Sequence, residues 1–406
     1  MKQITKLAWR NLWRNKRRTA ITLASVLMAV ILAVAIRSFQ KGVYENMISN
    51  AVRFSTGYLQ AHAKGYWEDK SINNAFTPDA HFDNVIADDE NVSLAVPRLE
   101  SFALASSGPH TKGVEVIGID PAKENKMNGL AKKIVEGKYL QMSDDGILVG
   151  DGLAKYLELK LGDTLVLLGQ GYHGMTAAGK YAIQGIFHYP VEQFNNGIVY
   201  LSLTEARKLF GTEGMLTSVS LMLNNSAQLD KTAQRIQSSV DTTMEIMEWQ
   251  KMNKSLVQEI QGDNSGGIIM LAILYLVVAF GVFGTIHMMT MERKKEFAVM
   301  VAIGMRKMKL MAIVFLETVF IACIGIAVGC IIILPVVFYF HNHPISLTGA
   351  AAAAYQQFGI EAVLPASLQS SIFIHQGITV LCIALVSVFY PLWYVGRLPL
   401  LENLKQ

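Results

Sequence analysis

The chain has 406 residues, of which 51% are hydrophobic and 17% are charged, and its formal net charge is +4. Together with a positive mean hydropathy, this composition excludes an ordinary soluble globular protein and favours a chain that resides in a membrane. The excess of Lys and Arg falls mostly in segments that flank apolar stretches, so it does not indicate nucleic-acid binding. Cys323, Cys330 and Cys382 all lie in apolar stretches, which excludes a disulfide framework.

The first 18 residues are basic, and an uncharged stretch, Thr19–Ile36, follows them directly. It predicts a first membrane-spanning helix, because about 20 helical residues cross a hydrocarbon layer of roughly 30 Å. Ala33-Val34-Ala35 also resembles a signal-peptide cleavage site, but the stretch is longer than the usual apolar core of a signal peptide. Trp9 and Trp13 in the basic flank are typical of interfacial anchors, so we favour a retained helix.

Residues 41–266 are numerous enough to form a large extracytoplasmic domain. Apolar residues in this region follow both strand and helix periods, which indicates an α+β fold. Helices over Lys41–Phe54 and Glu245–Ile260 are expected to act as stalks that continue the neighbouring membrane-spanning helices. The predicted strands are Ile147–Val149, Thr164–Leu168, Tyr181–Phe187, Ile198–Leu201 and Val219–Leu223, and the other predicted helices are Leu153–Leu159, Leu203–Phe210 and Ser226–Val240.

One motif in this domain nearly matches a nucleotide-binding P-loop. In Gly174–Tyr181, however, Tyr181 stands where the motif requires Ser or Thr to hold magnesium, and a strand rather than a helix is predicted next. We therefore interpret the glycine-rich segment 169–180 as a mobile hairpin tip, and its contact with a partner stays open. The aromatic segment 56–89 has no clear period, and the sequence does not decide between a separate lobe and a partner-facing arm.

Metal-ligand and catalytic patterns are weak in this sequence. The histidines are scattered, and the nearest to a ligand pair is His341-Asn342-His343, where capping at a membrane interface is the simpler interpretation. No Ser, His and Asp arrangement matches a hydrolase motif. We expect no enzyme chemistry on this chain.

Three further apolar segments, Gly267–Met289, Leu310–Phe340 and Ile372–Val395, are long enough to cross a membrane. Met291–Leu310 between the first two is basic and amphipathic, which predicts a short helix at the cytoplasmic face. The segment 341–371 contains no Lys or Arg, as an outer loop should. The basic-inside rule thus gives one consistent topology with both termini in the cytoplasm.

The predicted fold class is a membrane protein with four transmembrane α-helices in a 1+3 arrangement, and with a large α+β extracytoplasmic domain between the first and second helices. The chain then divides as follows. Expected parts are a cytoplasmic basic segment (1–18), transmembrane helices (19–40, 267–290, 310–340 and 372–395), the extracytoplasmic domain with its stalks (41–266), a cytoplasmic helix (291–309), an outer loop (341–371) and a cytoplasmic tail (396–406).

Glu317 is the one carboxylate inside the third apolar segment. A charge at this depth is costly unless it faces protein, water or a partner group. A hydrogen bond that fixes helix packing is the favoured interpretation, and a role in coupling or in a substrate path is the alternative. Gly325 and Gly329 nearby form a pair of small residues that suits close contact between helices.

Several motifs resemble those of the MacB/FtsX-type ABC transporter permeases, and within that family the lipoprotein-releasing LolC/LolE permeases. Glu292–Met305 is similar to the family's coupling segment, although Met300-Val301 replaces the usual Leu-Arg. The basic segment Leu7–Thr19 also looks like the family's N-terminal segment. Further similar stretches are Gly150–Ala154, Leu161–Thr164, Ile186-Phe187, Tyr200–Leu203, Tyr390-Pro391 and Arg397–Glu402.

The resemblance implies a non-catalytic permease subunit in a bacterial inner membrane. ATP and magnesium would be bound by a separate cytosolic ATPase, a second permease subunit would pair with this one, and segment 291–309 would be the coupling helix. Extraction of lipoproteins toward an outer membrane, through a periplasmic carrier, is the first expectation. The alternatives are efflux of drugs, peptides or toxins with a periplasmic adaptor, and signalling to a cell-wall enzyme. The residues implied in ATPase coupling are Glu292, Arg293, Lys294, Lys295, Glu296, Gly304 and Arg306.

Overall fold

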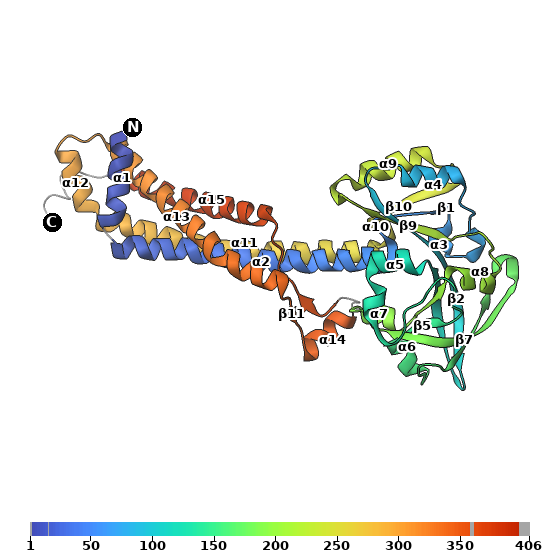
Figure 1. Ribbon diagram of the computed structural model, residues 1–406. Coiled ribbons are helices and arrows are strands. Elements are labelled where there is room, and N and C mark those ends of the chain that lie inside the picture. The colour runs from blue at the N-terminus through green and yellow to red at the C-terminus, as the bar shows by residue number, and fades with distance from the viewer. Residues whose placement is uncertain (1, 15, 358–360, 398–406) are drawn as a thin grey trace. The chain divides into compact units, whose positions relative to one another are not determined.

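The structure is a computed structural model that describes residues 2–14, 16–357 and 361–397 (Figure 1). Internal contacts divide the chain into two compact units. The helical unit contains the described residues up to 45, residues 259–346 and the described residues from 363 onward. The sheet unit contains residues 46–258 and the described part of 347–362. The predicted tail 396–406, with most of its Arg397–Glu402 motif, lies outside the described residues from position 398 on.

Four helices in the described part of the chain are long and apolar enough to cross a membrane. The first precedes the main segment of the sheet unit in the chain, and the other three follow it. With 27 to 39 residues, they are about 40 to 58 Å long, which exceeds the hydrocarbon layer of roughly 30 Å. They are α2 (Lys16–Ala51), α11 (Lys254–Glu292), α13 (Lys307–Asn342) and α15 (Ser370–Gly396).

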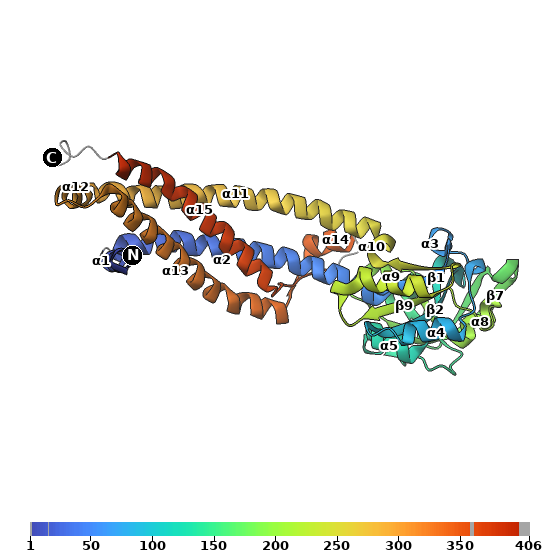
Figure 2. The same cartoon turned by 90° about the horizontal axis from the view of Figure 1, so that it is seen from above.

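Glycines bring α13 close to α2 in the helical unit. A Cβ atom built on Gly325 would lie 2.7 Å from Cγ1 of Val26, and one built on Gly329 would lie 3.1 Å from Cβ of Val30. Neither position has room for a larger side chain unless α2 moves. Buried side chains of α2, α11, α13 and α15 form one apolar cluster in this unit, and Figure 2 shows α13 and α15 running obliquely to α2 and α11.

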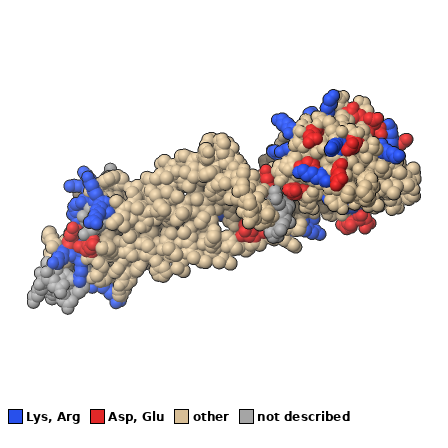
Figure 3. All heavy atoms as spheres, turned by 90° about the horizontal axis from the view of Figure 1, so that it is seen from below, with Lys and Arg blue, Asp and Glu red and all other residues tan. Residues whose placement is uncertain are grey.

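On the face of the helical unit that Figure 3 shows, a long stretch carries no charged side chain, and Lys and Arg side chains gather at one end. Phe280 of α11 and Phe389 of α15 are 68% and 70% exposed within the chain. Two short helices, α1 (Lys2–Arg14) and α12 (Lys294–Ala302), contribute bases to this basic end. Apolar side chains exposed in such number favour contact with lipid or with another membrane protein.

The sheet unit is built on one large, mostly antiparallel sheet. Among the described residues it has ten strands, in the order β10-β1-β9-β2-β3-β8-β5-β7-β4, with β6 paired to β2 and β7. The parallel pairs are β3 with β8 and β5 with β7. The strands are β1 (Leu59–Ala63), β2 (Val92–Ser107), β3 (His110–Ile119), β4 (Ile134–Gly137), β5 (Ile147–Gly150), β6 (Thr164–Gln170), β7 (Thr176–Phe187), β8 (Ile198–Ser202), β9 (Ser218–Leu223) and β10 (Met244–Glu248).

Helices cover this sheet and bury their apolar faces in its core. The helix α8 begins directly after β8, where the Ser202 hydroxyl accepts a hydrogen bond from the Glu205 amide at 3.3 Å. Ala206 and Phe210 on α8 are fully buried. These helices are α3 (Tyr66–Asp69), α4 (Ala80–Ala87), α5 (Pro121–Asn128), α6 (Asp151–Tyr156), α7 (Glu192–Asn195), α8 (Leu203–Phe210), α9 (Leu229–Ser239) and α10 (Trp249–Met252). The unit also contains α14 (Gly349–Gln357), whose described side chains are exposed or half-buried.

All five predicted strands are confirmed, within a few residues at their ends, and α8 has the predicted bounds. The prediction of a helix over Glu245–Ile260 is wrong at its start. Residues 244–248 form β10, which pairs with β1, because Met244 and Ile246 are buried there in strand alternation. The helical spacing holds from α10 onward, where Trp249 and Met252 are buried.

The segment 56–89 is neither a separate lobe nor a free arm. It supplies β1 within the sheet and α4 beside it, and Ile72 and Phe82 lie in the main hydrophobic core. The glycine-rich segment 169–180 forms the end of the β6–β7 hairpin, with residues 171–175 as the connection between the two strands, as predicted for a hairpin tip. The strand β7 starts at Thr176, which leaves no helix after the P-loop-like sequence.

Candidate functional site

The segment that joins α11 to α13 is a short helix followed by a tight turn. The helix α11 ends at Glu292, α12 follows, and Gly304 has a φ of +100°, which other residues rarely adopt. The Gly304 amide donates to the carbonyl of Val301 at 3.0 Å and closes the turn before α13 begins at Lys307. This geometry holds α12 in a fixed connection to both long helices.

Arg293, at the start of α12, points into the helical unit. Its side chain is 5% exposed, and Glu317 on α13 is 3% exposed. Nη1 of Arg293 donates to Oε2 of Glu317, and Nε donates to Oε2 of Glu296 at 3.3 Å. Nη2 of Arg293 is buried and has no hydrogen-bond partner among the described residues. The pair is thus buried, charged and incompletely satisfied, and removing Arg293 would leave the Glu317 carboxylate buried without its cation.

The N-terminal helix α1 completes this cluster. Nδ2 of Asn11 donates to Oε1 of Glu317 at 2.7 Å, and the Arg14 guanidinium pairs with Glu296. Leu12 packs in a small apolar cluster with α13. The helix α1, from the start of the chain, therefore meets the consecutive helices α12 and α13 around the Glu317 carboxylate. We call the five polar residues at this point the Arg293 cluster: Asn11, Arg14, Arg293, Glu296 and Glu317.

The remaining residues predicted for ATPase coupling are at the surface, apart from Lys294, which is half-buried. Among them stand exposed apolar side chains: Val299 is 46% exposed and Ile303 is 82% exposed. Mixed charged and apolar surface of this kind is typical of a protein-binding site. The exposed predicted residues are Glu292, Lys295, Glu296, Gly304 and Arg306.

The residues predicted for ATPase coupling thus lie in different environments: Arg293 is buried, Lys294 is half-buried and the others are exposed. Arg293 and Glu317 were expected in different roles, one for docking and one for packing, and they form one ion pair. Gly325 and Gly329 lie on the same helix but contact α2 instead. Sequence reasoning missed Asn11 and Arg14, because nothing in a basic amphipathic helix marks a residue that bonds to a carboxylate about three hundred positions away.

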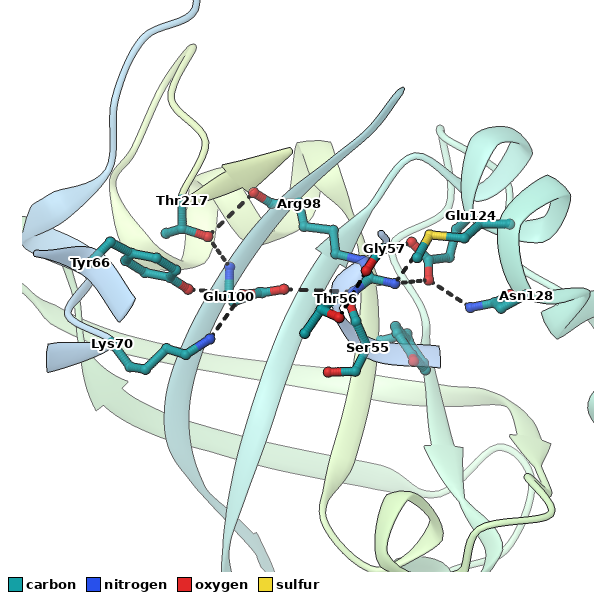
Figure 4. A network of polar contacts seen from close by, with 12 residues as sticks. Ser55, Thr56, Gly57, Tyr66, Lys70, Arg98, Glu100, Glu124, Asn128 and Thr217 are labelled. Carbon is teal, nitrogen blue, oxygen red and sulfur yellow. Dashed lines mark hydrogen bonds and ion pairs between the residues drawn. The ribbon is translucent and has the colours of Figure 1, made fainter. Parts of the chain in front are cut away.

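A second buried charge lies in the sheet unit, on β2 (Figure 4). Arg98 is 1% exposed, and its guanidinium binds Glu124 of α5 in bidentate fashion, with Nε at 3.0 Å and Nη2 at 2.6 Å from the carboxylate oxygens. Nη1 donates to the carbonyl of Ser55. Burial alone would lower the pKa of Arg98, but the Glu124 carboxylate outweighs it and raises that pKa above its ordinary value. Every nitrogen of this guanidinium has a partner.

Ser55 belongs to a π-helical turn, Val52–Thr56, which follows α2 directly. Such turns leave backbone carbonyls without their regular helical partners, and here Arg98 donates to one of them. The Gly57 amide donates to the Val52 carbonyl at 2.8 Å and ends the turn. Arg98 therefore fixes the point at which the helix ends and the sheet begins.

Carboxylates crowd the neighbouring strand positions. Glu100 accepts a hydrogen bond from the Tyr66 hydroxyl at 2.9 Å and lies 3.8 Å from Lys70 (Figure 4). Glu115 on β3 lies near it, and burial, followed by the Glu100 charge, raises the pKa of Glu115 to about 7. Burial likewise raises the pKa of Tyr66, and Glu100 adds to this. These contacts join the helix α3 to β2, and the Thr217 hydroxyl also accepts a hydrogen bond from the Glu100 amide at 2.8 Å.

Within the described ranges, no group of three or more His, Cys, Asp and Glu side chains is placed to hold a metal ion. The cysteines Cys323, Cys330 and Cys382 are free thiols. The geometry offers charged contacts between helices and, at α12, an exposed surface of mixed charged and apolar side chains.

Two family models match the chain. The MacB-like periplasmic core domain matches residues 19–239, which is more than half of the chain, and the FtsX-like permease C-terminal model matches residues 268–400. The chain belongs to the MacB/FtsX family of ABC transporter permeases. The second match contains all the residues of the Arg293 cluster except those contributed by α1.

Individual relatives of this permease are distant. It is similar to the lipoprotein-releasing system transmembrane protein LolC of Neisseria meningitidis, with 22% identity over 73% of this chain and 70% of that protein. It is 24% identical to an uncharacterized ABC transporter permease of Methanocaldococcus jannaschii, over 49% of this chain and 50% of the relative. The chain thus spans only about half the length of that archaeal permease.

Among solved structures, the permease resembles two domains. One is the extracellular domain of the noncanonic ABC-type transporter YknZ from Gram-positive bacteria, at 13% identity, a TM-score of 0.34, and coverage of 47% of this chain and 99% of that one. The other is the periplasmic region of MacB from Actinobacillus actinomycetemcomitans, at 11% identity, a TM-score of 0.36, and coverage of 51% and 94%.

Proposed function

We propose that this permease is a non-catalytic subunit that converts ATP hydrolysis on a separate cytosolic ATPase into movement of its own extracytoplasmic sheet unit. Four apolar helices in a 1+3 arrangement would cross the inner membrane with both termini in the cytoplasm. The parts would follow the predicted boundaries, with the extracytoplasmic domain over 41–266 and the coupling helix over 291–309. ATP and magnesium would be held by the ATPase, and a second permease subunit would complete the transporter.

The Arg293 cluster carries this proposal. A force applied to α12 acts directly on α13, because Arg293 and Glu317 form an ion pair that is buried between them. The incomplete hydrogen bonding of Arg293 favours a contact that exchanges partners over one that is permanently locked. The exposed charged and apolar residues of α12 supply the surface on which an ATPase would push.

This docking surface is tested by reversing its exposed charges while leaving Arg293 intact. In a Lys295→Glu, Arg306→Glu variant, we expect the ATPase to be lost when the permease is purified in mild detergent. Reversal of two exposed lysines of the sheet unit, Lys123→Glu and Lys126→Glu, is the matched control and should leave ATPase recovery unchanged. Full recovery of the ATPase with the α12 variant would overturn the assignment of the docking surface.

For the cargo, we propose lipoproteins that are extracted from the inner membrane and passed to a periplasmic carrier. The similarity to LolC over most of both chains supports this choice. Depletion of the permease should leave lipoproteins in the inner membrane fraction. Normal sorting of lipoproteins after depletion would refute this cargo but would not contradict the coupling proposal.

Efflux of drugs, peptides or toxins is the second candidate, and the MacB-like periplasmic core match favours it. It requires a periplasmic adaptor, which purification in mild detergent would recover with the permease, and it predicts a changed sensitivity to exported compounds after depletion. Signalling to a cell-wall enzyme is a third alternative. Recovery of such an enzyme, with normal lipoprotein sorting and unchanged drug sensitivity, would favour it.

A further inference from the structure

The helix α1 carries two kinds of exposed side chain that point to the same partner. Trp9 and Trp13 are 44% and 60% exposed, although Ala8 and Leu12 on the adjoining face are buried against the helical unit. The Trp9 ring meets Phe320 of α13 edge-on, with ring centres 5.7 Å apart. One face of α1 is therefore fixed to α13, and the aromatic residues beside it remain uncovered.

Bases border these aromatic residues. Lys6, Arg10, Lys16 and Arg17 are exposed, and none makes an ion pair or hydrogen bond with a described residue. The first acidic residue of the chain is Glu45, so no carboxylate on α1 or on the first half of α2 balances them. A face with indole rings beside uncompensated bases is complementary to an anionic lipid surface, where indole rings occupy the headgroup level.

From these observations we infer that α1, together with Lys16 and Arg17 at the start of α2, is a binding surface for anionic phospholipid headgroups. Lys6, Arg10, Lys16 and Arg17 contact the phosphates, while Trp9 and Trp13 enter the boundary between headgroups and acyl chains. This inference rests on the proposed function only for the position of α1 at the cytoplasmic membrane face.

The bound lipid would act on the coupling residues through α1 itself. Asn11 donates to Glu317, and Arg14 pairs with Glu296, so the position of α1 sets two contacts of the Arg293 cluster. An acidic face of the ATPase is the competing partner for the same bases. The exposed indole rings favour lipid, because bases alone would suffice for an acidic protein surface.

The test uses the full-length permease in nanodiscs made of an equal mixture of phosphatidylcholine and phosphatidylglycerol. Bromine, which quenches tryptophan fluorescence on contact, is placed on the acyl chains of one lipid or of the other. The signal of Trp9 and Trp13 is obtained by difference from a Trp9→Phe, Trp13→Phe variant. We expect brominated phosphatidylglycerol to quench this signal at least about twofold more than brominated phosphatidylcholine.

Neutralising the bases separates the outcomes. In a variant with Lys6, Arg10, Lys16 and Arg17 all changed to Gln, the two brominated lipids should quench equally. Lys123, Lys126, Lys132 and Lys160, which are exposed lysines of the sheet unit, are changed to Gln as the matched control, and the preference should persist.

Equal quenching in the wild type would overturn the inference and leave the membrane topology standing. The inference would also fail if the preference survived neutralisation of the four bases. Absence of quenching by either lipid would contradict the proposed position of α1 as well, and so would refute that part of the proposed function.

Discussion

The two buried arginines of this permease are alike in chemistry and differ in how fully they are bonded. Arg98 in the sheet unit donates from every nitrogen, to Glu124 and to the Ser55 carbonyl. Arg293 in the helical unit bonds Glu317 and Glu296, but its Nη2 is buried without a described partner. A guanidinium whose nitrogens all have hydrogen-bond partners favours one geometry. A guanidinium with an unpaired nitrogen can gain a hydrogen bond when the geometry changes.

This difference matches what each unit is proposed to do. Arg98 joins β2, α5 and the π-helical turn after α2 into one rigid body. The Arg293 cluster joins α1, α12 and α13, and in the proposed function α12 and α13 are the segments that transmit movement from the ATPase. Arg98 thus holds parts of the sheet unit together. Arg293 lies where a change of hydrogen-bond partner would transmit movement between helices.

The largest expected effect concerns Arg98. An Arg98→Met variant leaves Glu124 buried without its cation, and we expect the free energy of unfolding of the sheet unit to fall by about 3–5 kcal/mol. Denaturation followed by tryptophan fluorescence measures this, since Trp67 and Trp249 lie in that unit. Arg235, which binds Asp89 in bidentate fashion, provides the control. Its side chain is 52% exposed, and the buried Asp89 carboxylate also accepts from the Asn91 amide at 2.9 Å, so Arg235→Met should cost less. Equal losses in the two variants would remove the distinction that we draw for Arg98.

A smaller effect is expected where α13 meets α2. A Gly325→Leu side chain would overlap Val26, so the helical unit should lose roughly 1–3 kcal/mol of stability and melt at a lower temperature in detergent. Gly284→Leu on α11 is the control, because a Cβ atom there meets nothing within 4 Å in the chain. The packing account fails if Gly325→Leu melts no earlier than the control.

The smallest expected effect is a dependence of the stability of the sheet unit on pH, through Glu115. Burial and the Glu100 charge raise the pKa of Glu115 to about 7 in the folded state, from an ordinary value of 4.5. The folded state then binds more protons than the unfolded state between these values, so its stability falls as pH rises through this window. A Glu115→Gln variant should be more stable than the wild type at about pH 8, by on the order of 1 kcal/mol, and nearly equal to it at about pH 4.

Melting temperatures of the sheet unit across this pH range measure the effect. The control is Glu136→Gln, at an exposed position on β4. It should leave the change of melting temperature with pH as it is in the wild type. Parallel pH curves for Glu115→Gln and wild type would show that Glu115 titrates alike in the folded and unfolded states.

The parts of the fold that local periodicity determines were predictable. Strands such as Val219–Leu223 and the helix α8 have an apolar spacing that admits one assignment, and the four apolar helices follow from length and composition. The long strands β2 and β3 were not predicted. Polar residues such as Arg98, Glu100 and Glu115 interrupt their alternation, and the partners of Arg98 and Glu100 lie elsewhere in the sequence.

The candidate site was predictable only in part, for the same reason. The basic segment after α11 marks the position of α12, and Glu317 is conspicuous as a carboxylate among apolar residues. Their pairing is not visible in the sequence, because it depends on how α12 folds back against α13. The strand β10 shows the same limit: Glu245–Glu248 has helical spacing with the residues after it, but pairing with β1 decides its conformation.

The most direct test of the coupling account is a charge exchange at the Arg293–Glu317 pair. ATP hydrolysis by the complex of full-length permease and ATPase is measured for Arg293→Glu, for Glu317→Arg and for the double variant, with ATPase binding and an unchanged sheet unit as controls. We predict that each single exchange lowers permease-dependent ATP hydrolysis by at least about fivefold, and that the double exchange restores much of it. Single variants that bind the ATPase and hydrolyse ATP like the wild type would contradict the assignment of this pair to coupling.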